Sequence, residues 1–265
     1  MSKIIVFIPA YNCEKQLPRV LGQFDENILR YIEEIVVVNN LSTDDTESVA
    51  INYSTSHPHI PITVMTNKEN YNLGGSHKVA FNYAIEHGYD YVLVLHGDDQ
   101  ASIKDIIPII EDRIYKNYDA LLGARFMSGA KLHGYSFLRK WGNIGFNILY
   151  SLVTRKRIYD LGSGINMFSM SAMRKEQYEK LPDSLGFNNC LLLLMCYSKM
   201  KLKFFPITWR EDDQVSNLKL WNFGLFNLHI LKEYLLNAKQ FFMSDMRSKK
   251  IDSYDSEIVY CRGEK

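Results

Sequence analysis

Cysteine is scarce in this sequence, and no two cysteines have the spacing of a metal or redox motif. The chain of 265 residues has cysteines at positions 13, 190, 196 and 261, with no Cys-x-x-Cys pair. Its first residues, MSKIIVF, also lack the pattern of a secretory signal peptide. These features fit a reducing compartment best, so we expect a cytoplasmic protein.

Net charge and long apolar runs are lacking as well. The 31 basic and 30 acidic residues leave a net charge of +1, which argues against a protein built mainly to coat nucleic acid. The apolar run LLLLMCY at residues 191–197 is far shorter than the roughly 20 residues that cross a bilayer. We therefore predict a core helix there and no transmembrane span.

A glycine-rich nucleotide motif is missing after the first predicted strand. Residues 9–15 read PAYNCEK, where a nicotinamide-dependent oxidoreductase would carry Gly-x-Gly-x-x-Gly. A sugar nucleotidyltransferase would need a glycine-rich loop with Arg or Lys at the same place. The sequence therefore disfavours both classes of enzyme.

The sequence does contain a regular alternation of strands and helices. Runs rich in β-branched residues predict strands, and helical spacing of apolar residues between them predicts helices. The strands are expected at residues 3–9, 34–39, 62–66, 90–95 and 119–124. This βαβαβαβ order predicts an α/β fold with a doubly wound, mostly parallel, Rossmann-like sheet.

The most informative segment is DYVLVLHGDDQ at residues 90–100. Its apolar run ends at a cluster of His and Asp side chains, and open α/β sheets bind ligands beyond the carboxyl ends of their strands. Taken alone, Gly97-Asp98-Asp99 also fits a turn in which an Asp caps the next helix. This segment alone leaves both interpretations open, a metal-binding centre and a capped turn.

Two later segments combine apolar and basic residues. Residues 137–154 read FLRKWGNIGFNILYSLVT and precede Arg155-Lys156-Arg157, and residues 218–242 have a similar mixture. Such a composition is typical of a helix that lies on an anionic membrane surface, but also of a core helix with a solvated basic end. We expect one large domain over residues 1–217, a C-terminal helical extension over 218–247, and a polar, mobile tail over 248–265.

Several motifs together resemble a known family. In order, they are FIPAYNCEKQLPRVL, IVVVNNLSTDDT, NLGGSHKVAFNYA and YVLVLHGDDQ. This succession resembles family 2 glycosyltransferases of the GT-A fold. In the second half LGAR, DLGSGINMFS and PITWREDDQVSN resemble the dolichol-phosphate mannose synthase and polyprenyl-phosphate glycosyltransferase branch. The resemblance covers roughly residues 3–220.

The resemblance implies a divalent cation, Mn²⁺ or Mg²⁺, that bridges the phosphates of a nucleotide-diphosphate sugar. Asp98 is the expected anionic ligand, with a catalytic role through the metal, and Gln100 adds a carbonyl oxygen. His96 stands where the family usually has the first Asp of Asp-x-Asp. It either ligates the metal, which would favour Mn²⁺, or hydrogen-bonds a phosphate.

The resemblance also assigns residues to the donor. Pro9 and Tyr11 lie where the family holds the base and ribose, and Asn39-Asn40 replace the usual Asp-Asp there. The glycine loop that contains Gly74 would let backbone approach the diphosphate. The remaining predicted donor-binding residues are expected to lie near the phosphates: Arg125, Arg139, Arg210 and Ser216. Arg139 would face either the donor phosphates or a lipid phosphate.

Asp160 matches the family's Asp before Ser-Gly, where donor and acceptor meet. With a sugar hydroxyl as acceptor it would be the general base, and with a polyprenyl phosphate it would only orient groups. Asn166 replaces an Arg that the family often has, which weakens the case for a lipid phosphate.

The sequence therefore predicts a metal-dependent inverting glycosyltransferase with a lipid-linked or saccharide acceptor in cell-surface glycan synthesis. Peripheral contact with an anionic membrane, at the inner face of the plasma membrane, is part of this prediction; nucleic acid is not a partner. The alternative is a related protein that binds sugar nucleotide without turnover.

Overall fold

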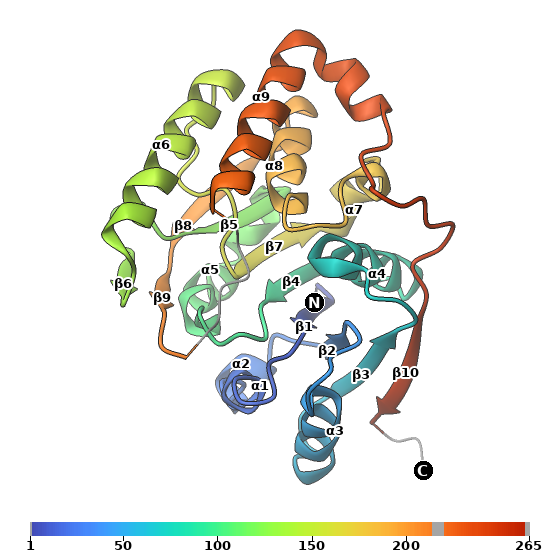
Figure 1. The fold of residues 1–265 in the computed structure, drawn as a ribbon. Coiled ribbons are helices and arrows are strands. Elements are labelled where there is room, and N and C mark those ends of the chain that lie inside the picture. Colours follow the sequence, from blue (N-terminus) through green and yellow to red (C-terminus); the bar gives the residue numbers. More distant parts are fainter. Residues whose placement is uncertain (1, 214–219, 263–265) are drawn as a thin grey trace.

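The computed structural model describes residues 2–213 and 220–262, which are organised around an eight-stranded sheet (Figure 1). The strand order is β10-β3-β2-β1-β4-β7-β5-β8. The strands are β1 (Ile4–Ala10), β2 (Glu34–Asn39), β3 (Ile62–Asn67), β4 (Tyr91–Leu95), β5 (Ala120–Ala124), β7 (Ile165–Ser169), β8 (Leu202–Pro206) and β10 (Ser256–Cys261). Two short strands, β6 (Lys131–His133) and β9 (Thr208–Arg210), pair separately.

The predicted α/β class is confirmed. Strands β3, β2, β1 and β4 are parallel neighbours, as the alternation of strands and helices predicts. Strand β7 runs antiparallel to both β4 and β5, so β5 points the same way as β4. The carboxyl ends of β1, β2, β4 and β5 therefore lie at one edge of the sheet.

Helices cover both faces of the sheet. One core contains Phe81, Phe168 and Leu193, and the predicted core helix at 191–197 is part of it. The other core contains Leu17, Ala50 and neighbours on the opposite face. The helical segments apart from two discussed below are α1 (Leu17–Leu21), α2 (Glu26–Leu29), α3 (Thr46–Ser56), α4 (Asn72–Glu86), η1 (Ile103–Asp105), α5 (Ile107–Glu111), η2 (Ile114–Asn117), α7 (Met170–Met173), η3 (Tyr178–Lys180) and α8 (Phe187–Tyr197).

Two long helices, α6 (Phe137–Thr154) and α9 (Leu220–Met243), contact each other beside α8 and leave apolar side chains exposed (Figure 1). The buried residues of α6 are Asn147 and Tyr150, whereas Phe137 and Leu138 are 76% and 78% exposed. Residues 137–154 thus pack on the core through Tyr150, Phe146 and Val153, while other apolar side chains of this helix are exposed. In the described ranges, no helix is long and apolar enough to cross a membrane.

The C-terminal segment is more ordered than its polar composition predicts. Residues 256–261 form β10, which pairs antiparallel with the edge strand β3 and shifts register between Ile258 and Tyr260. The expectation of a mobile tail is wrong for these residues, because the edge of β3 offers backbone partners that sequence patterns do not reveal. Tyr254 also anchors this segment by donating a hydrogen bond to Asp183 Oδ1 (2.7 Å).

Candidate active site

The predicted site residues converge beyond the ends of the parallel strands. The Gly97 amide donates a hydrogen bond to Pro9 O (3.1 Å), which joins the segment after β4 to the end of β1. The His96 amide donates to Gly164 O (2.8 Å), so the loop before β7 reaches the same edge. Motifs far apart in the sequence are thereby brought to one location.

The buried Asp99 side chain forms its contacts with other residues of the protein. It is 1% exposed, has a left-handed backbone (φ +60°), and accepts hydrogen bonds from Arg19 Nε (2.6 Å) and Gln23 Nε2 (3.2 Å). Arg210, predicted to contact donor phosphates, forms an ion pair with the Asp99 carboxylate and donates from Nε to Asp99 O (2.7 Å), and its side chain is 42% exposed. Sequence reasoning missed Arg19, although it lies on α1 within the motif FIPAYNCEKQLPRVL.

Asp98 is the carboxylate best suited to a cation at this edge. It accepts the Gln100 amide (3.3 Å), and burial raises the pKa of Asp98 to about 6, although backbone hydrogen bonds act in the opposite direction. Among the described residues, no three His, Cys, Asp or Glu side chains form a metal cage. A Mg²⁺ or Mn²⁺ ion shared with substrate phosphates needs only one or two protein carboxylates, so Asp98 and Gln100 fit that mode of binding.

His96 lies at the end of β4 with one ring nitrogen enclosed. Its Nε2 has no hydrogen-bond partner in the described structure, and the same is true of Nε2 in the neighbouring His77. Burial lowers the pKa of His96 to about 4 and that of His77 to about 3, so both rings are neutral near pH 7. His77 is a residue that the motif analysis did not single out.

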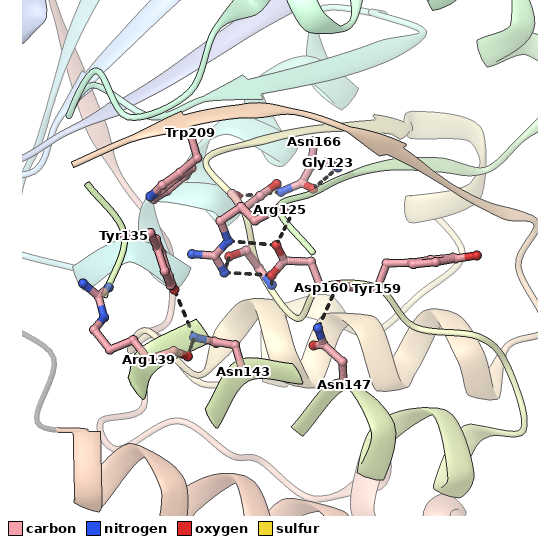
Figure 2. A network of polar contacts seen from close by, with 12 residues as sticks. Gly123, Arg125, Tyr135, Arg139, Asn143, Asn147, Tyr159, Asp160, Asn166 and Trp209 are labelled. Carbon is pink, nitrogen blue, oxygen red and sulfur yellow. Dashed lines mark hydrogen bonds and ion pairs between the residues drawn. The ribbon is translucent and has the colours of Figure 1, made fainter. Parts of the chain in front are cut away.

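Asp160 and Arg125, both predicted site residues, bind each other (Figure 2). Arg125 donates from Nη2 to Asp160 Oδ1 (2.7 Å), and from Nε and its backbone amide to Oδ2 (2.8 and 2.9 Å). The Gly162 amide also donates to Oδ1 (3.2 Å). Four hydrogen bonds occupy the acceptor sites of this carboxylate, since a carboxylate has about four lone-pair directions.

Aromatic rings enclose the Arg125 guanidinium. Its Cζ lies 4.8 Å from the ring centre of Trp209, 5.1 Å from Phe126 and 5.8 Å from Tyr135. Burial alone would lower the pKa of Arg125, but the Asp160 carboxylate more than offsets this and raises it. The Arg125 guanidinium is thus permanently charged and largely buried, and the Asp160 carboxylate neutralises its charge.

Arg139 lies next to this pair on α6. Its guanidinium stacks on Tyr135 (4.9 Å) and donates to Glu211 Oε2 (2.8 Å), and the side chain is 27% exposed (Figure 2). Tyr135 therefore separates the two arginines, with a cation on each side. Because Arg139 is partly exposed, it is the arginine of the two that an external phosphate reaches more easily.

Asn39 and Asn40 use their amide groups inside the protein. Both side chains are buried. Their partners are Glu47, Thr66 and the Ser42 amide for Asn39, and Asn67, Asn70 and the Tyr71 amide for Asn40. The predicted role in binding the base would require these internal bonds to be exchanged.

Tyr11, in contrast, presents a ring to solvent at the end of β1. The side chain is 46% exposed, next to Pro9 at the same strand end. An exposed aromatic face beside the strand ends is suited to stacking against a nucleotide base. Tyr11 therefore has the accessibility that its predicted role needs.

The glycine loop has a packing role. A Cβ on Gly74 would lie 2.4 Å from Pro182 O and 2.6 Å from Phe187 Cβ, so the protein's own backbone occupies the close approach expected for the diphosphate. Gly74 also donates its amide to Asp183 O (2.7 Å). Ser216, the other small residue predicted near the phosphates, lies outside the described residues.

Asn166 replaces an expected cation with a structural amide. Its Oδ1 accepts the Gly123 amide (3.2 Å), and its Nδ2 donates to Ser163 O (3.1 Å), so it joins β5 to the start of β7 (Figure 2). The side chain is 4% exposed. Asn166 therefore shapes the loop that holds Asp160.

Comparison with known proteins gives a consistent result. The family model described as Glycosyl transferase family 2 matches residues 5–181. An undecaprenyl-phosphate mannosyltransferase of Micrococcus luteus is 22% identical over 212 residues, which is 80% of this chain and 85% of that protein. A dolichyl-phosphate β-glucosyltransferase of Trichomonas vaginalis is 27% identical over 227 residues, covering 77% of this chain and 64% of that protein.

A solved structure with a similar fold is the mannosyltransferase PcManGT from Pyrobaculum calidifontis in complex with GDP-Man and Mn²⁺. The two structures agree with a TM-score of 0.61 at 15% sequence identity. The alignment covers 87% of this chain and 64% of the other, so this chain spans less than two thirds of that protein. At this identity the likeness shows a shared fold.

Proposed function

Because this chain belongs to glycosyl transferase family 2, we propose that it is a metal-dependent, inverting enzyme that moves a sugar from a nucleotide-diphosphate sugar to the phosphate of a lipid-linked acceptor. The chain has the GT-A fold and belongs to a class of enzymes that use nucleotide-sugar donors. A polyprenyl-phosphate acceptor at a membrane surface would place the reaction in cell-surface glycan synthesis.

The proposal of a phosphate acceptor rests on the hydrogen bonds of the Asp160 carboxylate. A sugar hydroxyl must lose its proton during attack and therefore needs a general base. The Asp160 carboxylate accepts four hydrogen bonds, three of them from Arg125, and has no acceptor site left for that proton. A phosphate oxygen is already ionised at neutral pH and attacks without a base. Asp160 then serves to hold Arg125 in place.

Asp98 would hold the divalent cation, with Gln100 as an oxygen ligand and His96 as a nitrogen ligand. When bound, the cation neutralises the charge that grows on the diphosphate as the glycosidic bond breaks. Arg210 and Arg19 fix the neighbouring Asp99 and so hold the loop that carries Asp98 in one conformation. The two adjacent aspartates thus have different roles.

Tyr11 would stack on the base of the donor, and Arg139 would meet the acceptor phosphate from the outer side of Tyr135. Attack from the side of the sugar opposite the diphosphate, in a single displacement, inverts the anomeric carbon. The arrangement thus needs binding and orientation from the protein, and proton transfer is not required.

The exposed apolar surface of α6 and α9 supports delivery of the acceptor from a membrane. Leu152 on α6 and Trp221 on α9 are 71% and 79% exposed. Lys140, Arg155 and Lys232 are the basic neighbours of such side chains on these helices or directly after them. Rings and aliphatic chains can enter the headgroup region while the cations meet anionic lipid.

A transfer assay tests the proposal. GDP-mannose, UDP-glucose and UDP-N-acetylglucosamine are each offered with Mn²⁺ or Mg²⁺ to a short-chain polyprenyl phosphate or to a panel of free saccharides. We expect a metal-dependent, phosphate-linked glycolipid and no glycosylated saccharide. Transfer to saccharides alone would refute the acceptor assignment.

A binder without turnover is the second candidate. The internal bonds of Asn39 and Asn40 favour it, because these buried amides are unavailable to a donor in the described conformation. The melting temperature of such a protein would rise in the presence of a nucleotide sugar and metal, because a ligand that binds the native state stabilises that state. It would then give no product with any acceptor in the panel.

A further inference from the structure

The two arginines on either side of Tyr135 each have a carboxylate as partner. Arg125 is paired with Asp160, and Arg139 donates from Nη1 to Glu211 Oε2 (2.8 Å). Two guanidinium charges are thus balanced by two carboxylates of the protein itself. A phosphate that binds Arg139 therefore competes with Glu211.

The two carboxylates differ in how firmly they are held. The Asp160 side chain is 1% exposed and accepts four hydrogen bonds. The Glu211 side chain is 18% exposed, and its Oε1 accepts one long hydrogen bond from Trp209 Nε1 (3.5 Å). Water weakens a partly exposed ion pair, whereas breaking a buried pair leaves an uncompensated charge. Glu211 is therefore the carboxylate that can leave its arginine.

The backbone at Glu211 is held in place. Its amide, directly after β9, donates a hydrogen bond to His133 O (3.1 Å). A Cβ on Gly134 would lie 2.6 Å from Glu211 O, so the two chain segments pack closely. Departure of the carboxylate from Arg139 thus needs rotation of one side chain and no movement of the loop.

We propose that Glu211 is an exchangeable anion of the acceptor site: its carboxylate yields Arg139 to the phosphate monoester of the acceptor and returns after transfer. This inference rests on the proposed transfer to a lipid-linked phosphate. A phosphate monoester carries a charge of about −1.5 to −2 and offers three acceptor oxygens, so it can replace a carboxylate on a guanidinium.

The charge of the acceptor changes during transfer in the direction that the exchange needs. One phosphate oxygen bonds to the anomeric carbon while the bond from that carbon to the nucleotide diphosphate breaks. The acceptor becomes a phosphodiester with a single negative charge, and the other charge leaves with the diphosphate. The diester is attracted to Arg139 less strongly than the monoester, so Glu211 regains the arginine more easily after transfer.

Binding of citronellyl phosphate, a short prenyl phosphate monoester, tests the first half of the exchange without metal or donor. Glu211→Gln keeps the shape of the side chain and removes its charge. Its affinity, measured by calorimetry, should rise about threefold to tenfold, because Arg139 is freed and a like charge is lost. Glu211→Ala should act in the same direction. Loss of a merely structural residue would weaken binding, so equal or weaker binding in both variants would overturn the proposal.

Asp213→Asn is the matched control. It removes the same charge two residues further on, from a carboxylate that is 43% exposed and pairs with Arg19 (2.9 Å). Solvent screens that charge, so the affinity for citronellyl phosphate should change by less than about twofold. A gain equal to that of Glu211→Gln would reduce the effect to net charge and would contradict a specific exchange at Arg139.

A second ligand distinguishes the acceptor from the donor as the source of the phosphate. The affinity for UDP with Mn²⁺ should not change in Glu211→Gln, because the exchange concerns the acceptor alone. Tighter binding of UDP, with no gain for citronellyl phosphate, would assign Arg139 to the donor and overturn the proposal.

Methyl citronellyl phosphate, a singly charged phosphodiester, tests the return of Glu211. It should bind the unmodified protein more weakly than citronellyl phosphate does and gain affinity in Glu211→Gln by a similar factor. A diester that bound the unmodified protein as tightly as the monoester would remove the cause of the return.

The exchange and the proposed transfer can fail separately. If the unmodified protein bound citronellyl phosphate without glycosylating it, and Glu211→Gln bound it more tightly, the exchange would stand and the transfer would fall. If the unmodified protein formed the glycolipid while Glu211→Gln left the affinity unchanged, the transfer would stand and the exchange would be refuted.

Discussion

Asp160 and Arg125 neutralise each other across the gap between the end of β5 and the loop before β7. Sequence motifs assigned them separate roles, a base and a phosphate-binding cation, but the structure joins them by three hydrogen bonds. The Asp160 side chain is 1% exposed and that of Arg125 10%, so each is the main counter-charge of the other. The pair therefore fixes the geometry of the acceptor side of the site.

Replacing Asp160 by Asn should destabilise the fold as well as the site. Loss of one partner from a buried ion pair typically costs about 3–5 kcal/mol, because the other charge remains in a closed environment. We expect the free energy of unfolding, measured by urea denaturation, to fall by about 3 kcal/mol. A decrease within about 0.5 kcal/mol, as for an ordinary surface change, would show that the pair has no structural role.

The double variant Arg125→Met with Asp160→Leu is the control for that experiment. Apolar side chains of similar size can replace a buried ion pair at little cost or even with a gain in stability. The double variant should recover most of the lost stability but have no transferase activity. Recovery of activity together with stability would contradict a role for the pair in the reaction.

The order of elements in the first half could be predicted because each strand carries its own signal. Runs such as EIVVVN at residues 34–39 are apolar and β-branched since both faces of a parallel strand are buried, and the structure has β2 over this range. Strand β10 could not be predicted this way. It pairs on one side only with β3, and Ile258 is 46% exposed, so the usual apolar pattern of a buried strand is absent.

The sequence predicts the sheet edge at which the candidate site residues lie, but not the partners of these residues within the protein. Strand ends predict where side chains gather, and Asp98, Arg125 and Asp160 do lie at one edge. Which groups neutralise each other depends on contacts between residues far apart in the chain, such as Arg19 with Asp99. Motifs contain no information on such pairings, so the ion pair between Arg210 and Asp99 could not be predicted.

Metal binding should depend on pH through Asp98. Burial raises the pKa of this carboxyl from 3.8 to about 6 in the folded protein, so protons compete with Mn²⁺ below that pH. We expect the Mn²⁺ affinity, measured by calorimetry with UDP, to fall by about tenfold per unit below pH 6. Asp98→Asn should remove metal-dependent binding at every pH, and unchanged affinity in this variant would exclude Asp98 from the site.

The same shift predicts how the stability of metal-free protein changes with pH. A carboxyl whose pKa is raised on folding favours the folded state while it is protonated, and this contribution is lost as pH rises from about 4 through about 6. The contribution is no more than about 3 kcal/mol, at 1.36 kcal/mol per pKa unit. Asp98→Asn should remove this part of the pH dependence from a series of urea titrations, and a wild-type slope in the variant would assign it to another group.

Tyr11 should contribute to donor affinity through its ring. Stacking of a base on an aromatic side chain is worth about 1–3 kcal/mol, so Tyr11→Ala should weaken nucleotide-sugar binding by about tenfold or more. Tyr11→Phe keeps the ring and should bind nearly as well as the unmodified protein. Tyr197, 41% exposed on α8, offers the matched control: Tyr197→Ala should leave the dissociation constant unchanged. Equal affinity for Tyr11→Ala and the unmodified protein would contradict the stacking role.

Membrane contact should depend on the apolar surface of α6 and α9. Leu152 and Leu225 are 71% and 53% exposed on these helices, and inserting a leucine side chain into an apolar environment is worth about 1.5–3 kcal/mol. Leu152→Ser with Leu225→Ser should therefore reduce co-sedimentation with phosphatidylglycerol vesicles by more than tenfold. Ile258→Ser changes a similarly exposed side chain on β10 and should have no effect.

Because Lys140 and Arg155 add electrostatic attraction, binding should also weaken with salt and on neutral phosphatidylcholine vesicles. Equal loss of binding in Ile258→Ser, or none in the double variant, would place the membrane contact elsewhere.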